Sequence, residues 1–177
     1  MRVVLVRHGI AEELSAVARA PGGAPPRDDD RALTEVGRKR VRKAALGLRK
    51  LLGRPTWIVH SGLVRARQTA DLLAERLRPR HPELLVTDAL RSEADPAAWF
   101  PFLRDLVQSQ RHDRTAVVAV GHAPNVDRIV ALACGAERRL MTAFGKAAAA
   151  CLELPDSGRP AGRLVWFLTP KMVRAFS

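Results

Sequence analysis

The stretch Val3-Val4-Leu5-Val6-Arg7-His8-Gly9 decides the fold of this chain. Four consecutive apolar residues, three of them valine, predict a short buried strand. An arginine, a histidine and a glycine follow directly, at the point where that strand ends. Because open α/β sheets bind ligands at the carboxyl ends of their strands, the stretch predicts an α/β fold with a functional site at the end of the first strand.

Further apolar runs of strand length follow along the chain. Segments with helical periodicity separate the early runs, an alternation typical of a largely parallel sheet. A loop at 155–162, rich in proline and glycine, indicates a hairpin between the last two runs and hence at least one antiparallel strand. We expect one domain over residues 1–177, a three-layer α/β/α fold with a mostly parallel central sheet. The expected strands cover residues 3–6, 57–59, 84–86, 116–120, 149–154 and 164–168.

Two amphipathic helices are expected in the first half of the chain. Thr34 is a good N-cap for the first, and Gly37 fits a close contact of that helix. The second helix begins near Leu63, with Arg65 close to its start and outside its buried stripe. The apolar stripes comprise Val41, Ala44, Ala45, Leu48 and Leu52 in the first helix, and Leu63, Ala66, Ala70, Leu73 and Leu77 in the second.

Two more helices are predicted by their end signals. Asp95-Pro96 is typical of an N-cap followed by proline at the first helical position, and it opens a helix that runs through Val107. Pro124 opens another helix, which Gly135 ends.

The composition favours anionic partners. The chain holds 30 Lys+Arg against 18 Asp+Glu, a net charge of +12, which attracts phosphate esters, acidic protein surfaces or nucleic acid. Cys134 and Cys151 are too few for a disulfide framework, lack the spacing of a zinc site, and are interpreted as small buried residues. No apolar run reaches the roughly 20 residues that span a bilayer, and no signal peptide is recognisable, so a cytoplasmic location is expected.

The segment from Ala18 to Arg31 has the composition of a mobile loop and is expected to flank the mouth of the site. Its run Asp28-Asp29-Asp30 is open to two interpretations, a metal site and a solvated turn. Adjacent aspartates lack the alternating spacing of a calcium loop, which favours the turn. No metal and no cofactor are expected.

Three more segments give the opening stretch its meaning. They are Leu33-Thr34-Glu35-Val36-Gly37, then Ser61-Gly62-Leu63-Val64-Arg65-Ala66-Arg67-Gln68-Thr69-Ala70, and Gly121-His122 after an apolar run. In this order, from residue 2 to about residue 130, the chain resembles the histidine phosphatase superfamily, also called the phosphoglycerate mutase-like family. The resemblance implies a catalytic set of His8, Arg7, Arg65 and His122.

That set suits phosphoryl transfer. Arginine supplies planar, permanently charged donors for phosphate oxygens, and Arg7, Arg65 and the His122 imidazole can form such a cradle, with the amide of Gly9 close to the substrate. Neutral imidazole is nucleophilic near pH 7 without a separate base. His8 is therefore expected to attack phosphorus and to carry a covalent phosphohistidine intermediate, as the resemblance also implies.

Other polar residues near the motifs are assigned lesser roles. Ser61 is expected to cap the helix that carries Arg65 and to border the substrate site. For His60, His81 and His112 a structural role is preferred, and of the three His60 adjoins a motif.

The general acid of the family has no clear counterpart. Relatives that act on alcohol phosphates carry a carboxylic acid after the third strand, and the aligned position is Ala89. Asp88 and Glu93 are imperfect substitutes, and Asp95 is interpreted as a helix cap. An alkoxide leaving group needs a proton, whereas an imidazole leaving from phosphohistidine needs less help. The absence favours a phosphohistidine substrate.

The chain is similar to the small phosphohistidine phosphatase branch, the SixA type, in its length, its Leu-Thr-x-x-Gly segment and its compact Gly-His segment. The leading hypothesis is a metal-independent phosphatase that removes phosphate from histidine on a protein, at a shallow and open pocket. A small-molecule phosphomonoesterase that uses Glu93 or Asp88 as general acid is the alternative. A third hypothesis is a basic module that binds nucleic acid or polyphosphate and has a vestigial site; it is disfavoured because the catalytic set is intact and no basic stretch is interleaved with aromatic residues.

Overall fold

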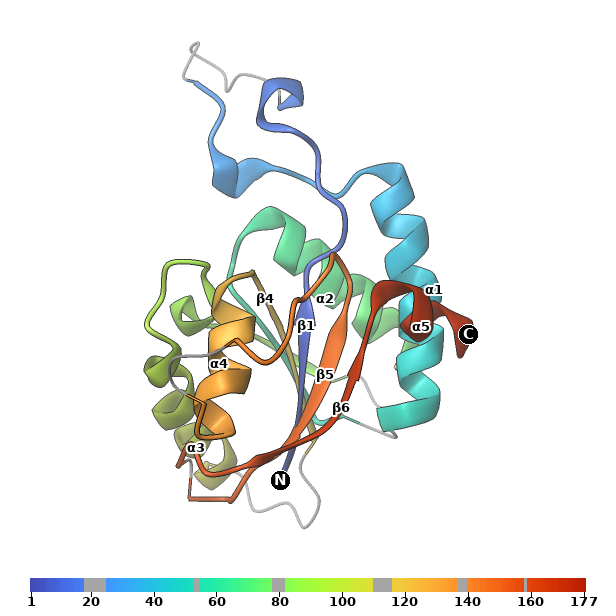
Figure 1. Cartoon of the computed structure of the whole chain (residues 1–177). Helices are drawn as coiled ribbons and strands as arrows, with labels where there is room; N and C mark the ends of the chain where they lie inside the picture. Colours follow the sequence, from blue (N-terminus) through green and yellow to red (C-terminus); the bar gives the residue numbers. More distant parts are fainter. Residues whose placement is uncertain (18–24, 53–54, 78–81, 110–115, 137–139, 158) are drawn as a thin grey trace.

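The computed structural model describes residues 1–17, 25–52, 55–77, 82–109, 116–136, 140–157 and 159–177. Its centre is one six-stranded sheet in the order β3-β2-β4-β1-β5-β6 (Figure 1). The strands are β1 (Arg2–Arg7), β2 (Trp57–His60), β3 (Glu83–Val86), β4 (Ala116–Gly121), β5 (Ala149–Glu153) and β6 (Arg163–Leu168). The helices are α1 (Glu35–Leu52), α2 (Val64–Arg76), α3 (Trp99–Gln108), α4 (Asn125–Ala133) and α5 (Pro170–Ala175).

The sheet is mostly parallel, as predicted. β1 pairs in parallel with β4, and β2 pairs in parallel with both β4 and β3. β5 runs antiparallel to its neighbours β1 and β6, which confirms the predicted hairpin.

Helices cover both faces of the sheet, so the predicted three-layer architecture is confirmed (Figure 1). Successive side chains of β1 point to opposite faces, as in any strand. Val3 and Leu5 join a core under α3 and α4, whereas Val4 and Val6 join a core under α1, α2 and α5. No helix in the described ranges is long and apolar enough to cross a membrane.

The predicted helix ends are confirmed by their hydrogen bonds. Thr34 Oγ1 accepts a bond of 2.9 Å from the Gly37 amide. Asp95 Oδ1 accepts a bond of 2.9 Å from the Ala97 amide, at the start of a 3-10 turn (Pro96–Ala98) that leads into α3. Gly135, just after α4, has φ +72°, the left-handed conformation in which glycine ends helices.

The topology brings three chain segments to one edge. β1 lies next to β4, β4 lies next to β2, and all three run parallel, so their carboxyl ends meet. The residues that follow these strands are His8, His122 and Ser61. The register pairs Arg7 with Gly121, which sets His8 beside His122.

Candidate active site

His8 and His122 form the centre of the site. Their ring centroids lie 4.8 Å apart with an interplanar angle of 47°, and the two residues are 3% and 2% exposed. The His8 amide also donates to the Gly121 carbonyl over 3.1 Å, which extends the pairing of β1 and β4 by one step. Histidines from sequence positions more than a hundred residues apart are therefore held in contact by strand register.

One ring nitrogen of His8 carries the lone pair that a nucleophile needs. Its Nδ1 lies 2.7 Å from the Gly9 carbonyl oxygen, and a carbonyl can only accept, so Nδ1 carries the proton of the neutral ring. The lone pair then resides on Nε2. Fixing the tautomer through the second nitrogen is a common way to prepare a histidine for chemistry.

The surroundings keep both rings neutral. Burial lowers the pKa of His8 to about 2, and the positive charges of Lys146 and Arg65 and the His122 ring add to that effect. Burial also lowers the pKa of His122 to about 4, again with help from Arg65 and Lys146. A neutral His8 at physiological pH retains the lone pair that attack on phosphorus requires.

Arg7 enters the site from the end of β1. Its Nη1 donates to the Phe144 carbonyl over 2.6 Å, whereas its Nε is buried and has no hydrogen-bond partner among the described residues. Burial lowers the pKa of this guanidinium, and the nearby Asp127 carboxylate opposes the shift. A buried donor without a partner fits a group that binds an anion when substrate arrives.

Asp127 of α4 fixes the segment 142–144, whose Phe144 carbonyl bonds to Arg7. Its Oδ1 accepts hydrogen bonds of 3.0 Å from the Thr142 hydroxyl and from the Phe144 amide. The carbonyl of Phe144 in turn accepts from Arg7. Asp127 is 4% exposed, so it is a buried carboxylate that positions a cation through the intervening backbone.

Arg65 lies in the first turn of α2 and is 5% exposed. As predicted, Arg65 is not part of the apolar core of α2. It is nevertheless buried, because it points into the site. Thr69, one turn later, accepts a bond of 3.1 Å from the Gly9 amide and donates one of 2.7 Å to the Arg65 carbonyl. The Gly9 amide is therefore occupied by Thr69, whereas the sequence suggested that it faces substrate.

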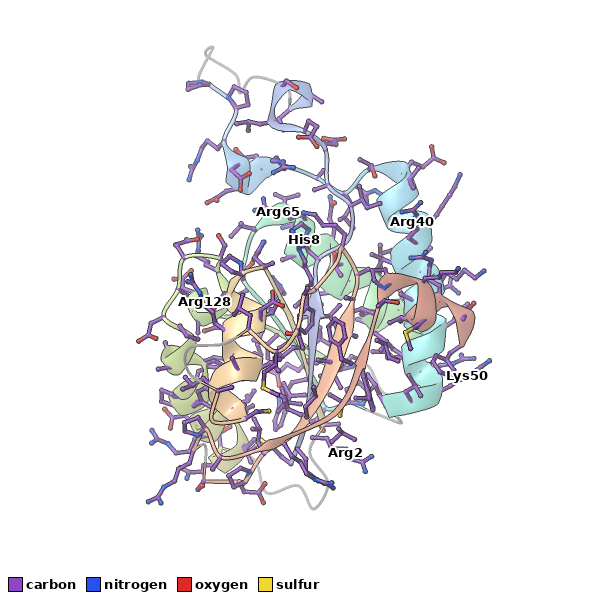
Figure 2. All side chains as sticks on the ribbon, in the orientation of Figure 1. Arg2, His8, Arg40, Lys50, Arg65 and Arg128 are labelled. Carbon is purple, nitrogen blue, oxygen red and sulfur yellow. The ribbon has the colours of Figure 1, made fainter. Side chains whose placement is uncertain are left out.

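Asp28 is bonded to Arg65. Its carboxylate Oδ2 accepts from Arg65 Nη2 over 2.7 Å, and its Oδ1 accepts from Arg31 Nη1 over 2.9 Å. The 3-10 turn Asp28–Asp30 lies beyond the carboxyl edge of the sheet, above the labelled Arg65 and His8 (Figure 2). The segment is a turn, as predicted, and 53% of the Asp28 side chain is exposed, but the sequence did not predict that this carboxylate pairs with Arg65. The remainder of the loop, residues 18–24, lies outside the described residues.

Ser61 borders the site but caps no helix. Its Oγ lies 2.7 Å from His122 Nε2, and α2 begins at Val64 after Leu63, whose side chain makes no capping bond. The expected capping role was wrong because the helix starts three residues after Ser61, too far for its hydroxyl to reach the first turn as an N-cap. The serine instead fixes the ring orientation of His122.

The three remaining histidines differ in what can be said of them. His60 is buried, and its Nδ1 accepts from the Gly62 amide over 3.1 Å, which fits the structural role expected of it. His81 and His112 lie outside the described residues.

Among the described residues, neither candidate acid hydrogen-bonds to His8 or His122, although the charge of Glu93 interacts with the His122 ring. The side chains of Asp88 and Glu93 are 86% and 70% exposed, and Asp88 Oδ1 pairs with Arg91 Nε at 2.8 Å. A hydrogen bond from the Ser92 hydroxyl lowers the pKa of Glu93, whereas a general acid at neutral pH needs a raised one. Ala89, at the aligned position, is 9% exposed and brings no acid.

Lys146 belongs to the site although sequence analysis missed it. Its Nζ lies 3.4 Å from His8 Nε2. It stands alone in an alanine-rich stretch, with no motif spacing to mark it, and only the course of the chain before β5 brings it to His8. The described residues contain no group of three or more His, Cys, Asp or Glu side chains that could hold a metal ion.

Comparisons with known proteins identify the family of the chain. The model of the histidine phosphatase superfamily (branch 1) matches residues 3–99, more than half of the chain. An uncharacterized protein of Picosynechococcus sp. is 32% identical over 126 residues, which are 71% of this chain and 68% of that protein.

Several solved structures share the fold. The protein histidine phosphatase SixA complexed with tungstate superposes with a TM-score of 0.77 at 24% identity, over 97% of this chain and 98% of that one. The SixA protein of Agrobacterium tumefaciens gives 0.69 at 25% identity, over 96% and 97%. A mycobacterial glucosyl-3-phosphoglycerate phosphatase gives 0.67 at 21% identity, over 95% and 98%. With the family model matched across β1, α1 and α2, the chain belongs to the histidine phosphatase superfamily and is a phosphatase.

Proposed function

We propose that this phosphatase removes phosphate from phosphohistidine on a protein, through a covalent intermediate on His8. The observation that carries the proposal is the side chain at the position of the family's general acid, which is Ala89. The two carboxylates nearby are exposed and engaged with Arg91 or Ser92. A site that lacks a general acid suits an imidazole leaving group, which departs with less need of a positioned proton donor than an alkoxide.

In the first step Nε2 of His8 attacks phosphorus, and a P–N bond to His8 forms as the P–N bond to the substrate imidazole breaks. The departing imidazole takes a proton from solvent at its freed nitrogen. Arg7 and Arg65 bind the non-bridging oxygens, where charge must be balanced throughout the transfer. Arg65 must exchange the Asp28 carboxylate for the phosphoryl group at this stage.

In the second step a water molecule attacks phosphorus and the P–N bond to His8 breaks. Inorganic phosphate leaves, His8 regains its lone pair, and the proton of the attacking water passes to solvent. Because His8 is neutral with its proton on Nδ1, the ring carries a positive charge only while Nε2 is bonded to phosphorus, and it departs readily as a neutral imidazole.

The first experiment compares substrates. Purified protein is assayed with a chemically phosphorylated phosphohistidine protein and with a panel of sugar and nucleotide phosphates, with and without a chelator. We expect kcat/KM for the phosphohistidine protein to exceed that for every alcohol ester by about two orders of magnitude or more, in chelator as well. Equal or faster turnover of a sugar or nucleotide phosphate would identify the enzyme as a small-molecule phosphomonoesterase.

The second experiment tests the acid directly. Glu93→Gln is expected to leave turnover of phosphohistidine and of alcohol esters unchanged within about twofold, because the native side chain is exposed and ionised. Ala89→Asp places a carboxyl group at the aligned position and is expected to raise alcohol ester turnover relative to phosphohistidine turnover. Ala94→Asp, a few residues along the same loop, is the matched control. A loss in Glu93→Gln confined to alcohol esters would argue against the proposal.

Binding of nucleic acid is the remaining alternative from the charge of +12. The labelled basic side chains Arg2, Arg40, Lys50 and Arg128 lie on β1, α1 and α4 in different parts of the molecule (Figure 2). Such a distribution favours general attraction of anions. Binding to oligonucleotides should therefore disappear at moderate salt and show no sequence preference.

A further inference from the structure

We propose that Lys146 is a catalytic residue, an additional cation that binds a non-bridging oxygen of the phosphoryl group while His8 attacks phosphorus. The inference concerns the transfer step itself, so it rests on the phosphatase activity and not on the identity of the substrate.

The position of the ammonium group is the first argument. Lys146 Nζ lies 3.4 Å from His8 Nε2, the nitrogen that holds the lone pair. In an in-line transfer, phosphorus takes the place next to Nε2, and its three non-bridging oxygens surround the line of attack. A cation already in contact with Nε2 is therefore within reach of one of those oxygens. In the absence of substrate it caps the lone pair that will attack.

The backbone holds Lys146 in place. The Ala148 amide donates to the Gly145 carbonyl over 2.9 Å, which closes a tight turn with Lys146 at its second position. The Ala147 amide donates to the carbonyls of Arg7 and His8 over 3.0 and 3.2 Å, and the Arg7 amide donates to the Ala148 carbonyl over 3.1 Å. The turn is thus tied to the same two residues that carry the phosphate-binding arginine and the nucleophile.

The turn also contains a strained residue. Ala147 has φ +65°, a left-handed conformation that is unfavourable for a non-glycine residue and that glycine would adopt freely. Strain of this kind persists where the surrounding structure demands it, often at functional sites. At this turn it directs Lys146 to the nucleophile.

The charges around Lys146 leave it in need of an anion. Burial, together with the positive charges of Arg7, Arg31 and Arg65, lowers its pKa to about 8, and Asp28 is the carboxylate that opposes the shift. Among the described residues its hydrogen bond is with His8, a neutral partner. A half-buried ammonium among arginines is costly by itself and becomes favourable when a dianionic phosphoryl group enters.

The first test is a pair of substitutions. Lys146→Met keeps length and removes the charge, whereas Lys146→Arg keeps the charge; Lys43→Met, at an exposed position on α1, is the matched control. Each variant is assayed with para-nitrophenyl phosphate and with phosphoramidate. Inhibition is measured with vanadate, which mimics the transition state, and with inorganic phosphate.

We expect Lys146→Met to lower kcat by about 30-fold. Inhibition by vanadate should weaken more than inhibition by phosphate, because the contact with Lys146 strengthens in the transition state. Lys146→Arg should stay within about fivefold of the native enzyme, and Lys43→Met should be unchanged. Activity of Lys146→Met within twofold of native, with unchanged vanadate inhibition, would overturn the proposal.

A pH profile gives an independent measurement. It uses the native enzyme and Lys146→Arg, so it does not depend on the folding of Lys146→Met. The kcat/KM of the native enzyme, which reports the free enzyme, should fall as pH rises through about 8, where Lys146 gives up its proton. The His8 and His122 rings are already neutral there, and the three arginines stay charged. In Lys146→Arg this alkaline decline should move above pH 10, and a decline at the same pH in both proteins would contradict the role of Lys146.

These outcomes are separate from those of the substrate comparison. If alcohol esters prove to be the preferred substrates, Lys146→Met should still lower kcat for them. If phosphohistidine is preferred but Lys146→Met is fully active, only the inference about Lys146 fails.

Discussion

The carboxylate of Asp28 lies 2.7 Å from the Nη2 of Arg65, so the phosphate-binding arginine is bonded to an acidic group of its own chain. Two acceptors of Asp28 occupy Arg65, because Nη2 donates to the carboxylate Oδ2 and Nη1 donates to the backbone carbonyl, whereas the carboxylate Oδ1 accepts from Arg31. The two oxygens bonded to Arg65 take donors that a phosphoryl group would also use. Asp28 also interacts favourably with the cations around it, since a hydrogen bond from Arg31 and then one from Arg65 lower the pKa of its carboxyl group.

Removing this carboxylate should ease the entry of anions. Asp28→Asn is expected to tighten inorganic phosphate or vanadate inhibition by about two- to fivefold, a modest factor because the Asp28 side chain is 53% exposed and such pairs are weak. Asp30→Asn, an exposed neighbour in the same turn, should change nothing. Weaker inhibition in Asp28→Asn would mean that Asp28 orients Arg65 for substrate instead of competing with it.

Loss of the nucleophile should abolish turnover. His8→Ala is expected to reduce kcat by about a thousandfold or more, since the remaining cations still bind phosphate but nothing replaces Nε2. Native enzyme quenched in alkali during turnover should carry a phosphoryl group that acid removes and that maps to His8. His60→Asn, a change at another buried histidine, should keep both activity and labelling. Native turnover by His8→Ala would refute the covalent mechanism.

The two site histidines should make the fold sensitive to acid. Their pKa values in the folded protein, about 2 and about 4, lie below the ordinary value of 6.5, so the unfolded chain binds more protons below pH 6.5. The free energy of unfolding is therefore highest above pH 6.5, and it decreases as pH falls toward the pKa values of the two rings in the folded protein. At about 1.4 kcal/mol for each unit below 6.5 and each ring, the free energy of unfolding should fall by about 4 kcal/mol from pH 7 to pH 5.

Urea unfolding at pH 7 and pH 5, without phosphate, measures this loss. His122→Gln removes one of the two titrating rings and should recover about half of it. His60 contributes in the same direction, because burial lowers its pKa as well, so some loss remains in every variant. An identical loss in His122→Gln and in the native protein would show that other groups dominate.

The fold was predictable because local signals and topology agree. The valine-rich run of β1, the cap at Thr34 and the Asp95-Pro96 signal each act within a few residues, and the structure confirms all of them. The predicted first strand ended at Val6 and the structure extends it to Arg7, a difference within the usual uncertainty of element ends.

The site was predictable only where a motif marks it. The structure brings Arg7, His8, Arg65 and His122 together, because Arg7, His8 and His122 lie at or just after the ends of β1 and β4, and Arg65 lies in the first turn of the helix that follows β2. Lys146 carried no such mark, since its place depends on a turn fixed by backbone bonds to β1. The occupation of Arg65 by Asp28 depends on the path of a loop, which periodicity does not predict.

The buried carboxylate of Asp127 offers a test of indirect positioning. Asp127→Ala removes the acceptor for Thr142 and for the Phe144 amide, and leaves two buried donors without partners. We expect a loss of about 2–3 kcal/mol in the free energy of unfolding and a raised KM, since the carbonyl that holds Arg7 moves. Asp127→Asn keeps an accepting oxygen and should recover most of both. A lowered kcat with an unchanged KM would show that Asp127 acts on the chemical step and not on phosphate binding by Arg7.

Ser61 should control the ring of His122. Its Oγ lies 2.7 Å from His122 Nε2, and the residue is fully buried, so Ser61→Ala leaves that nitrogen without its partner. We expect kcat to fall by about five- to twentyfold with little change in KM, because the ring contacts the phosphoryl group best in one orientation. Ser61→Thr keeps the hydroxyl and should retain more activity than Ser61→Ala if the extra methyl fits. The NMR signals of the His122 ring should shift in Ser61→Ala and stay in place in Ser109→Ala, an exposed serine whose hydroxyl donates to the Leu106 carbonyl. If kcat falls without any change at the His122 ring, Ser61 acts on substrate directly and not through the histidine.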